Sequence, residues 1–257
     1  MKKMNGLKKG FFLILLFTSF YTFSQVNIKD SSIFTPMFYG CYAYQVPGGD
    51  MADRFGNSSD IGAGFQIKLK SNWLLGTEFN YLWGSKVKGG DEILKNVLTS
   101  DGNLINIGGM YAIFDLFERG YTITGYVGKV IPVLSPNPNS GIYFRAGVGY
   151  MQHWIRIQVQ EQESVPWMDG DYAKGYDRLS SGLTINEFIG YLFLGNTRIF
   201  NFYAGFEFVQ AWTKNRRDVN FDTGEKDDKL RFDILTGFKI GWVIPLYKRT
   251  PSDYYFY

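Results

Sequence analysis

The sequence is short of cysteine, of histidine and of long apolar runs. Cys41 is the single cysteine among 257 residues, so no disulfide can form within the chain. His153 is the single histidine, which leaves histidine-based acid–base catalysis to one position. Beyond residue 24, polar or charged side chains interrupt every apolar run before the roughly 18 residues of a membrane-spanning helix. These absences exclude a disulfide framework and a helical span in the mature chain.

The first 24 residues have the pattern of a secretory signal peptide. Four lysines come first, an apolar stretch follows from Phe11 to about Phe17, and Thr22 and Ser24 place small side chains before the expected cleavage point. An uncleaved membrane anchor is the alternative, but the apolar stretch is shorter than the roughly 20 residues that span a bilayer. No cysteine lies in the first 40 residues, which excludes cleavage as a lipoprotein. We therefore expect residues 25–257 to form the mature protein, as one domain.

The positive charge of the chain belongs to this leader. The whole sequence has a formal net charge of +3, from 27 lysines and arginines and 24 acidic residues. The leader contains four of the lysines and no acidic residue, so 23 positive and 24 negative side chains remain after cleavage. A nearly neutral mature chain gives no reason to expect a nucleic-acid partner.

Glycine and aromatic side chains are abundant, and they recur with a period of two. Aromatic residues make up 18% of the chain and there are 30 glycines. In residues 73–84 the sequence WLLGTEFNYLWG alternates wide apolar side chains with smaller or polar ones. Successive strand side chains point to opposite faces, so this alternation predicts β-strands. Eight are predicted, at residues 36–46, 61–70, 73–84, 104–114, 142–159, 182–195, 201–213 and 230–247.

The connections between these strands alternate in length. Ser71-Asn72 and residues 196–200 are short, whereas the other connections are long and polar, at residues 47–60, 85–103, 160–181 and 214–229. Long loops at one end and short turns at the other are typical of a transmembrane barrel. Residues 115–141 break this order, because they fall at the short-turn end and yet are long. They are interpreted as an extra strand or as a helix against the periplasmic side, and the pattern leaves both open.

One face of the predicted strands is wide and aromatic, and the other mixes glycine with charge. A soluble sandwich would instead pack its apolar faces together and expose the polar ones. We therefore predict an all-β fold, a closed antiparallel transmembrane β-barrel of eight strands with long extracellular loops. Trp73 and Trp83 lie ten residues apart on one face, about 25 Å along the membrane normal for a strand tilted by about 40°. The predicted aromatic girdles contain Trp73, Trp83, Trp154, Trp212 and Trp242.

The opposite face carries charges of both signs. An eight-stranded barrel leaves a lumen that side chains just fill, and buried charges are tolerated only when they are paired and hydrogen-bonded. We therefore expect a cross-linked polar plug in place of a channel, with the alternative that individual members lie unpaired at the wet rims. The predicted lumen charges are Lys68, Glu78, Arg145, Glu207, Arg231, Asp233 and Lys239.

Three stretches carry a resemblance to a known family: the leader ending in FSQ, the glycine–aromatic strands FRAGVGY and FYAGFEF, and the aromatic end DYYFY. They resemble the small outer-membrane barrels of the OmpA and OmpX type, in the aromatic-rich form common in Bacteroidota. The last strand, FKIGWVIPLY, matches the barrel-assembly signal of such families. The resemblance implies the outer membrane as location, insertion by the barrel-assembly machinery, and contact with outer-membrane lipid and lipopolysaccharide. Residues 248–257 depart from the pattern, as a tail that docks in the periplasm, binds a partner or frays.

Two polar loops are candidate binding sites. The first is PGGDMADRFG, with Asp50, Asp53 and Arg54, although ordinary turn chemistry also explains its composition. The second could hold a calcium ion, but the spacing of an EF-hand is absent and a solvated loop is the simpler interpretation; its acidic residues are Asp169, Asp171 and Asp177. We predict no catalytic residue, no metal ligand and no cofactor.

Three functions are compatible with such a barrel. The first is a non-enzymatic anchor or accessory subunit of an envelope complex, of the barrel-assembly or type IX secretion kind, because residues 115–141 and the tail exceed what a barrel needs. The second is a small porin or solute-binding barrel, which would need more strands or an unplugged lumen. The third is a lipid-modifying enzyme, but such enzymes need a histidine near a serine and HWIRIQ offers none. We expect the first, with other outer-membrane or periplasmic proteins as partners.

Overall fold

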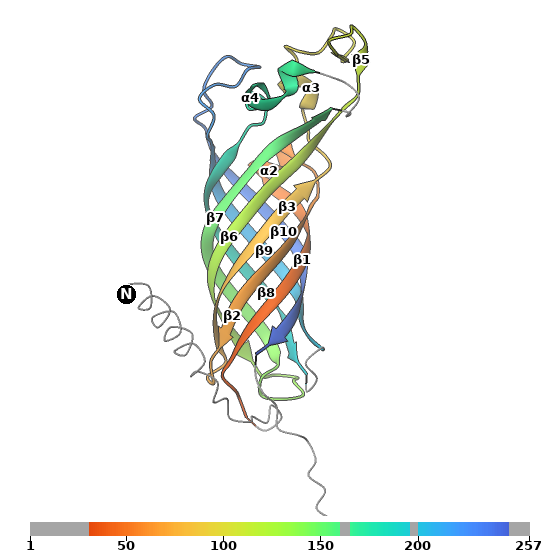
Figure 1. Cartoon of the computed structure of the whole chain (residues 1–257). Coiled ribbons are helices and arrows are strands. Elements are labelled where there is room, and N and C mark those ends of the chain that lie inside the picture. Colours follow the sequence, from red (N-terminus) through yellow and green to blue (C-terminus); the bar gives the residue numbers. More distant parts are fainter. Residues whose placement is uncertain (1–30, 160–164, 196–199, 247–257) are drawn as a thin grey trace, which may run out of the picture.

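Eight strands form a closed ring in the computed structural model, which describes residues 31–159, 165–195 and 200–246 (Figure 1). Their order around the ring is β1-β10-β9-β8-β7-β6-β3-β2. Each neighbouring pair is antiparallel, and β1 pairs with both β10 and β2. Among these residues no helix is both long enough and apolar enough to cross a membrane. The predicted signal peptide, residues 1–24, and tail, residues 248–257, lie outside the described residues.

The ring strands run between a turn end and a loop end. They are β1 (Thr35–Gly49), β2 (Ser58–Lys68), β3 (Trp73–Gly84), β6 (Phe114–Ile131), β7 (Gly141–Val159), β8 (Ser180–Leu194), β9 (Asn201–Asn215) and β10 (Leu230–Pro245). The short elements between them are α2 (Asp50–Arg54), α3 (Gly90–Ile93), the β4 (Leu104–Ile105) and β5 (Tyr111–Ala112) hairpin, the 3-10 helix η1 (Pro166–Met168) and α4 (Gly170–Ala173). All of them lie toward the same end of the barrel (Figure 1), as the alternation of loop lengths predicted.

One predicted barrel strand was wrong, and a neighbouring segment takes its place. Residues 104–112 of the predicted strand 104–114 form the β4–β5 hairpin, whose turn contains Gly109 with φ of 79°. The fourth ring strand is β6, which pairs with β3 from Trp83↔Arg119 to Trp73↔Lys129. Of the two interpretations of residues 115–141, the extra strand is therefore correct and the periplasmic helix is not, and the connection at the turn end is residues 132–140. The eight-strand count was correct although one of its members was not.

The alternation of β6 is disguised by the composition of its two faces. On its outward face, Arg119, Gly125 and Lys129 interrupt apolar side chains such as Ile123 and Val127. Its inward face has Tyr126 and Val130, which are buried in the lumen. The usual contrast between an apolar face and a polar face is therefore weak in this strand, although it is the second longest of the ring.

The outward face of the ring is a band of apolar side chains between two aromatic rows. Trp83, Trp154 and Trp212 lie toward the loop end of β3, β7 and β9, and Trp73 and Trp242 lie toward the turn end of β3 and β10. Exposed side chains between the rows include Phe79, Ile123, Val148, Phe206 and Ile240. A closed ring leaves no strand edge unpaired, and an apolar exterior around a charged interior is the arrangement that lipid requires. The fold is that of an outer-membrane barrel.

The strands differ in length, and the two longest carry a second structure above the mouth. β6 has 18 residues and β7 has 19, which corresponds to about 45 Å along the membrane normal, against an apolar band of about 25 Å. Above the mouth, residues 85–113 and 165–179 pack together as a cap. Its apolar core consists of Leu94, Leu104, Ala112, Val165, Met168 and Tyr176. The loop end is therefore a folded structure with its own core.

Candidate functional site

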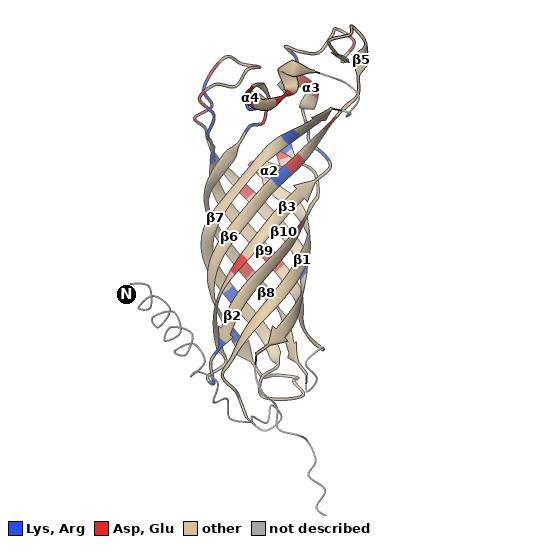
Figure 2. Cartoon of the chain, viewed as in Figure 1, with Lys and Arg blue, Asp and Glu red and all other residues tan. Residues whose placement is uncertain are grey.

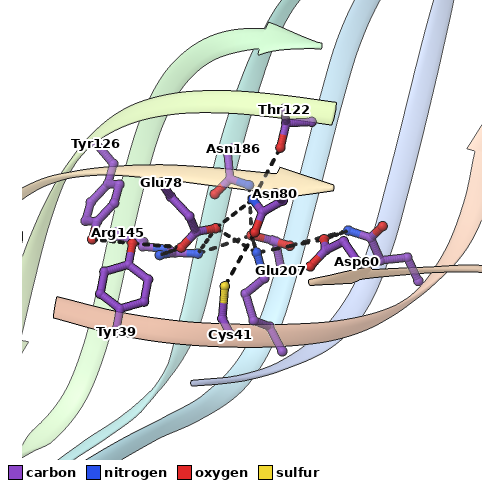
Figure 3. Close-up of polar contacts among 12 residues, drawn as sticks. Tyr39, Cys41, Asp60, Glu78, Asn80, Thr122, Tyr126, Arg145, Asn186 and Glu207 are labelled. Carbon is purple, nitrogen blue, oxygen red and sulfur yellow. Dashed lines mark hydrogen bonds and ion pairs between the residues drawn. The ribbon is translucent and has the colours of Figure 1, made fainter. Parts of the chain in front are cut away.

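A cluster of five charged side chains crosses the lumen at the middle of the barrel. We call it the ionic belt, and it consists of Asp60, Glu78, Arg145, Glu207 and Lys239, one from each of β2, β3, β7, β9 and β10. All five have exposed fractions of 4% or less. Acidic and basic positions gather at this height in Figure 2, and Figure 3 shows the contacts that join them. The belt connects opposite walls of the ring, so it obstructs the lumen where a channel would have to pass.

Each cation of the belt bridges two carboxylates. Lys239 Nζ lies 2.8 Å from Glu78 Oε1 and 2.7 Å from Glu207 Oε1. Arg145 donates to both oxygens of Glu78, at 2.6 and 3.2 Å, and to Glu207 Oε1 at 3.2 Å. Asp60 lies further out, 3.9 Å from Lys239, and accepts a hydrogen bond of 2.9 Å from Gln45. Charges buried to this degree are tolerated only when opposite charges pair with them.

Neutral side chains complete the belt and separate it from the turn end. Asn80 donates to Glu78 and Asn186 donates to Glu207, each at 2.9 Å. On the turn side lies a layer of buried aromatic rings, in which the guanidinium of Arg145 stands 4.9 Å from the ring centre of Tyr126 and 5.7 Å from that of Tyr203. Cation–π contacts of this kind hold the arginine in place when it is desolvated. The layer consists of Tyr39, Tyr126, Tyr143, Phe188 and Tyr203.

A second obstruction lies nearer the loop end, where α2 enters the mouth of the barrel. Met51 and Phe55 are buried among inward side chains of the ring, with exposed fractions of 0% and 1%. Arg54 pairs with Asp233 of β10. Asp233 also accepts hydrogen bonds from Thr213, at 2.5 Å, and its Oδ2 lies 3.2 Å from His153 Nε2. We call residues 50–55 the plug, because they fill the mouth and are bonded to its wall.

The plug corresponds to the candidate binding loop of the sequence analysis. Asp50 accepts hydrogen bonds from the backbone N–H of Phe232, at 2.7 Å, and from Lys229, at 3.3 Å. The N–H of Phe232 lowers the pKa of the Asp50 carboxyl, and Lys229 acts in the same direction. Asp53 is exposed. Asp50 and Arg54 thus hold the plug on the barrel wall, which the sequence interpretation as a surface binding loop did not anticipate.

The structure brings four of the seven predicted lumen charges into the belt and places the other three elsewhere. Asp233 binds the plug, and Arg231 pairs at the mouth with Asp227 of the preceding loop. Lys68 lies at the turn end, where its amine donates to Asn139 Oδ1 at 2.8 Å and to Ser32 Oγ at 3.0 Å. Lys68 is buried without a carboxylate partner among the described residues, so neutral oxygens satisfy its donors.

Sequence reasoning missed two inward carboxylates. Asp60 was assigned to a loop because the strand was taken to begin at residue 61, although Asp60 shares the parity of the inward Gly62 and Gly64. Glu118 is 1% exposed and its carboxylate forms no hydrogen bond with the described residues; it lies on β6, the strand whose pattern was not recognised. Extending the parity of β2 by two residues would have found Asp60.

Two other candidate sites are occupied by internal contacts. His153 is fully buried beneath the ring of Phe55, 5.6 Å between centroids. Ser180 is its partner across the β7–β8 pair, a proximity that local sequence could not reveal, but the Ser180 hydroxyl donates to the carbonyl of Arg178. In the aspartate-rich loop, the ion pairs are Asp171 with Lys174 and Asp177 with Arg217. No group of three potential ligands close enough to hold a metal ion occurs in the described part of the chain.

No protein-family model and no curated protein matches the chain. Solved structures similar to it include neisserial surface protein A, with a TM-score of 0.44 and 9% identity over 81% of this chain and 96% of that one. Another is the attachment invasion locus protein Ail of Yersinia pestis in complex with the heparin analogue sucrose octasulfate, with a TM-score of 0.39 and 10% identity over 82% and 99%. A third is the N-terminal β-barrel domain of Pseudomonas aeruginosa OprF, with a TM-score of 0.35 and 8% identity over 81% and 97%. Each likeness is partial, and we carry nothing over from it to this chain.

Proposed function

We propose that this chain is a non-conducting, non-enzymatic outer-membrane barrel that anchors its cap at the cell surface, as an accessory subunit of an envelope complex. The observation that carries the proposal is the double obstruction of the lumen by the ionic belt and the plug. A porin needs a continuous polar path, whereas the belt joins β3, β7, β9 and β10 through direct contacts of 3.2 Å or less. Transport is therefore the function that this lumen supports least.

The cap supports the assignment of an anchoring role. The β4–β5 hairpin directs Leu104 and Ala112 into the cap core and leaves other apolar side chains in solvent. Ile107, Met110 and Tyr111 have exposed fractions of 67%, 69% and 63%. Apolar groups clustered in this way on a soluble surface mark sites of protein–protein contact. The surface available to a partner is therefore on the loop side, and the periplasmic segment that first suggested a partner is the membrane strand β6.

The burial of the single histidine supports the absence of catalysis. A lipid-modifying enzyme must place its base within hydrogen-bonding reach of a substrate. His153 and Ser180 have exposed fractions of 0% and 1%, and they lie inside the ring beneath the plug. A lipid outside the wall has no path to them through the paired strands β7 and β8.

Two measurements on the mature protein test the proposal. The first is single-channel conductance of the refolded barrel in a planar bilayer, alongside its heat-modifiable migration on a gel. We expect the migration shift of a folded barrel and no conductance. Steady ion conductance from folded protein would contradict the anchoring role and favour the porin alternative.

The second measurement locates the partner. A photo-crosslinking residue at Met110, in the cap, is compared with one at Leu134, an apolar side chain at the turn end with an exposed fraction of 92%. We expect a stoichiometric adduct from position 110 in intact cells and none from position 134. Adducts from position 134 alone would indicate that the partner binds at the periplasmic side, and this would contradict the role assigned to the cap.

A further inference from the structure

The cations at the loop end divide into two groups according to their partners. Four arginines pair with carboxylates of the loops or the wall, in Arg54–Asp233, Arg178–Asp222, Arg217–Asp177 and Arg231–Asp227. Several other loop-end cations form no ion pair with any carboxylate of the described residues. Four of them lie on or just beyond the loop ends of β3, β6 and β7, and we call these the basic rim: Lys86, Lys88, Arg119 and Arg156. The one acidic residue on the outward faces of β3, β6 and β7 is Asp115.

The basic rim lies at the height of lipid headgroups. Arg119 is paired in register with Trp83 on one side and Trp154 on the other, so it stands within the aromatic row of the loop end. Arg156 is two residues further along β7 on the same face as Trp154, about 5 Å above it along the membrane normal. Aromatic girdles mark the boundary between hydrocarbon and headgroups. Cations at and just above that boundary meet the phosphates of the outer leaflet.

A groove of about 670 Å³ opens beside the rim, between the loop end of β1 to β3 and the chain that follows β3. Its walls carry cations, an indole, a phenol and polar groups, from Tyr44, Asn57, Ser59, Trp83, Lys86 and Lys88. Asn57 donates to Tyr44 Oη at 2.7 Å, and Lys88 Nζ is held 2.5 Å from the carbonyl of Ala52. The Ser58 hydroxyl at the groove has no hydrogen-bond partner among the described residues. The volume suits a sugar-sized headgroup.

An apolar trough lies on the same strands below the rim. It has a volume of about 770 Å³ and is lined by side chains such as Phe65, Leu75, Val127 and Val148. Gly125 opens it, because a Cβ at this position would meet no atom within 4 Å. Gly125 is six residues from Arg119 on β6, about 15 Å deeper in the membrane. The apolar band is about 25 Å thick, so the trough lies past its midplane, deeper than the acyl chains of a lipid held at the rim.

We propose that the basic rim and the groove bind the phosphorylated headgroup of an outer-leaflet lipid. Two features favour a lipid over a soluble anion: the girdle height of Arg119 and the aromatic wall of the groove. The unpaired cations and the single opposing acid supply the charge complementarity that phosphate requires. This inference rests on the membrane location of the proposed function, and it does not depend on whether the lumen conducts.

The test is native mass spectrometry of the mature protein titrated with diphosphoryl lipid A, with a glycolipid of similar chain length that lacks phosphate as the second probe. The Lys86→Ala/Arg156→Ala variant removes two rim cations whose side chains form no hydrogen bond or ion pair with the described residues. Its matched control is Lys174→Ala/Lys226→Ala, which removes two loop-end cations that pair with Asp171 and Asp228. We expect one retained lipid A per wild-type or control barrel and about 30-fold weaker binding by the rim variant.

A third variant tests whether the site is confined to the outer half of the membrane. Gly125→Leu fills the trough in open space, so we expect it to fold and to leave retention of lipid A unchanged. Equal binding by the rim variant and its control would overturn the inference, as would equal binding of the phosphate-free glycolipid. Either result would leave the conductance of the barrel unchanged, so failure here is distinct from failure of the anchoring proposal.

Discussion

The ionic belt and the basic rim are both clusters of charge on one barrel, and they differ in where their counter-charges lie. In the belt, Arg145 and Lys239 are almost fully buried and each contacts two carboxylates of the protein. In the rim, Lys86 and Arg156 are exposed and contact none among the described residues. Buried charge demands internal compensation, whereas charge at a surface can be compensated from outside. The belt therefore maintains the structure, and the rim is available to a ligand.

The largest expected effect comes from removing one cation of the belt. Arg145→Met leaves Glu78 and Glu207 in the lumen with only Lys239 between them. We expect a loss of about 3–5 kcal/mol in the free energy of unfolding, because breaking a buried ion pair leaves uncompensated charge. Urea unfolding followed by heat-modifiable gel migration measures it. Lys86→Met in the rim is the matched control, and a similar loss in both variants would abolish the distinction between the two clusters.

A smaller loss is expected at the plug. Asp233→Leu removes the acceptor shared by Arg54, His153 and Thr213. We expect a decrease of about 1–3 kcal/mol in the free energy of unfolding, because two buried donors, His153 and Thr213, and the half-buried Arg54 lose their partner. Asp53→Leu, at an exposed position of the same plug, is the control. Conductance should remain absent in both variants because the belt is intact, and a pore in Asp233→Leu would show that the plug alone seals the lumen.

Substitution in the rim should leave the fold almost unchanged. For Arg156→Ala we expect the free energy of unfolding to stay within about 0.5 kcal/mol of the wild type, as for other surface substitutions. The same urea titration measures it. A loss as large as that at the plug would mean that Arg156 is structural, and the lipid-binding result for the rim variant would then need a different explanation.

The smallest effect is a dependence on pH at the outer surface of the plug. The hydrogen bond from the Phe232 N–H lowers the pKa of Asp50 in the folded protein, so the fold favours the carboxylate. Its contribution is present above the unfolded pKa and is lost as the pH falls through the lowered folded pKa. We expect the urea midpoints of wild type and Asp50→Asn to differ at neutral pH and to converge in acid. A difference that grows in acid would contradict this.

The period of two was sufficient to predict the architecture and part of the belt. Glu78, Arg145, Glu207 and Lys239 could be identified because each lies in a strand whose opposite face is clearly apolar. The strand β6 could not be identified in this way, because Tyr126 faces inward and charged side chains face outward, which weakens the contrast between its two faces. Glycine at residues 108 and 109 was a turn signal within the predicted strand 104–114, and reading it would have moved that strand to the loop.

Contacts between segments that are distant in the sequence could not be predicted from local sequence patterns. That α2 folds back into the mouth follows from Met51 and Phe55 finding an apolar layer formed by five strands, and no spacing within residues 47–56 indicates it. The basic rim was missed for a related reason. Its members come from three separate segments, and their significance lies in the absence of nearby carboxylates among the described residues, which only the arrangement in space can show.

The length of β6 and β7 determines which part of the molecule is most accessible from outside the cell. β6 and β7 continue five residues beyond the outer aromatic row, which raises the cap some 13 Å above the band that lipid covers, and the β4–β5 hairpin stands at its far end (Figure 1). An antibody or a phage would therefore reach the turn at Gly108-Gly109 before any other part of the wall. An epitope tag inserted at that turn would be read on intact cells while the ring below kept its hydrogen bonds.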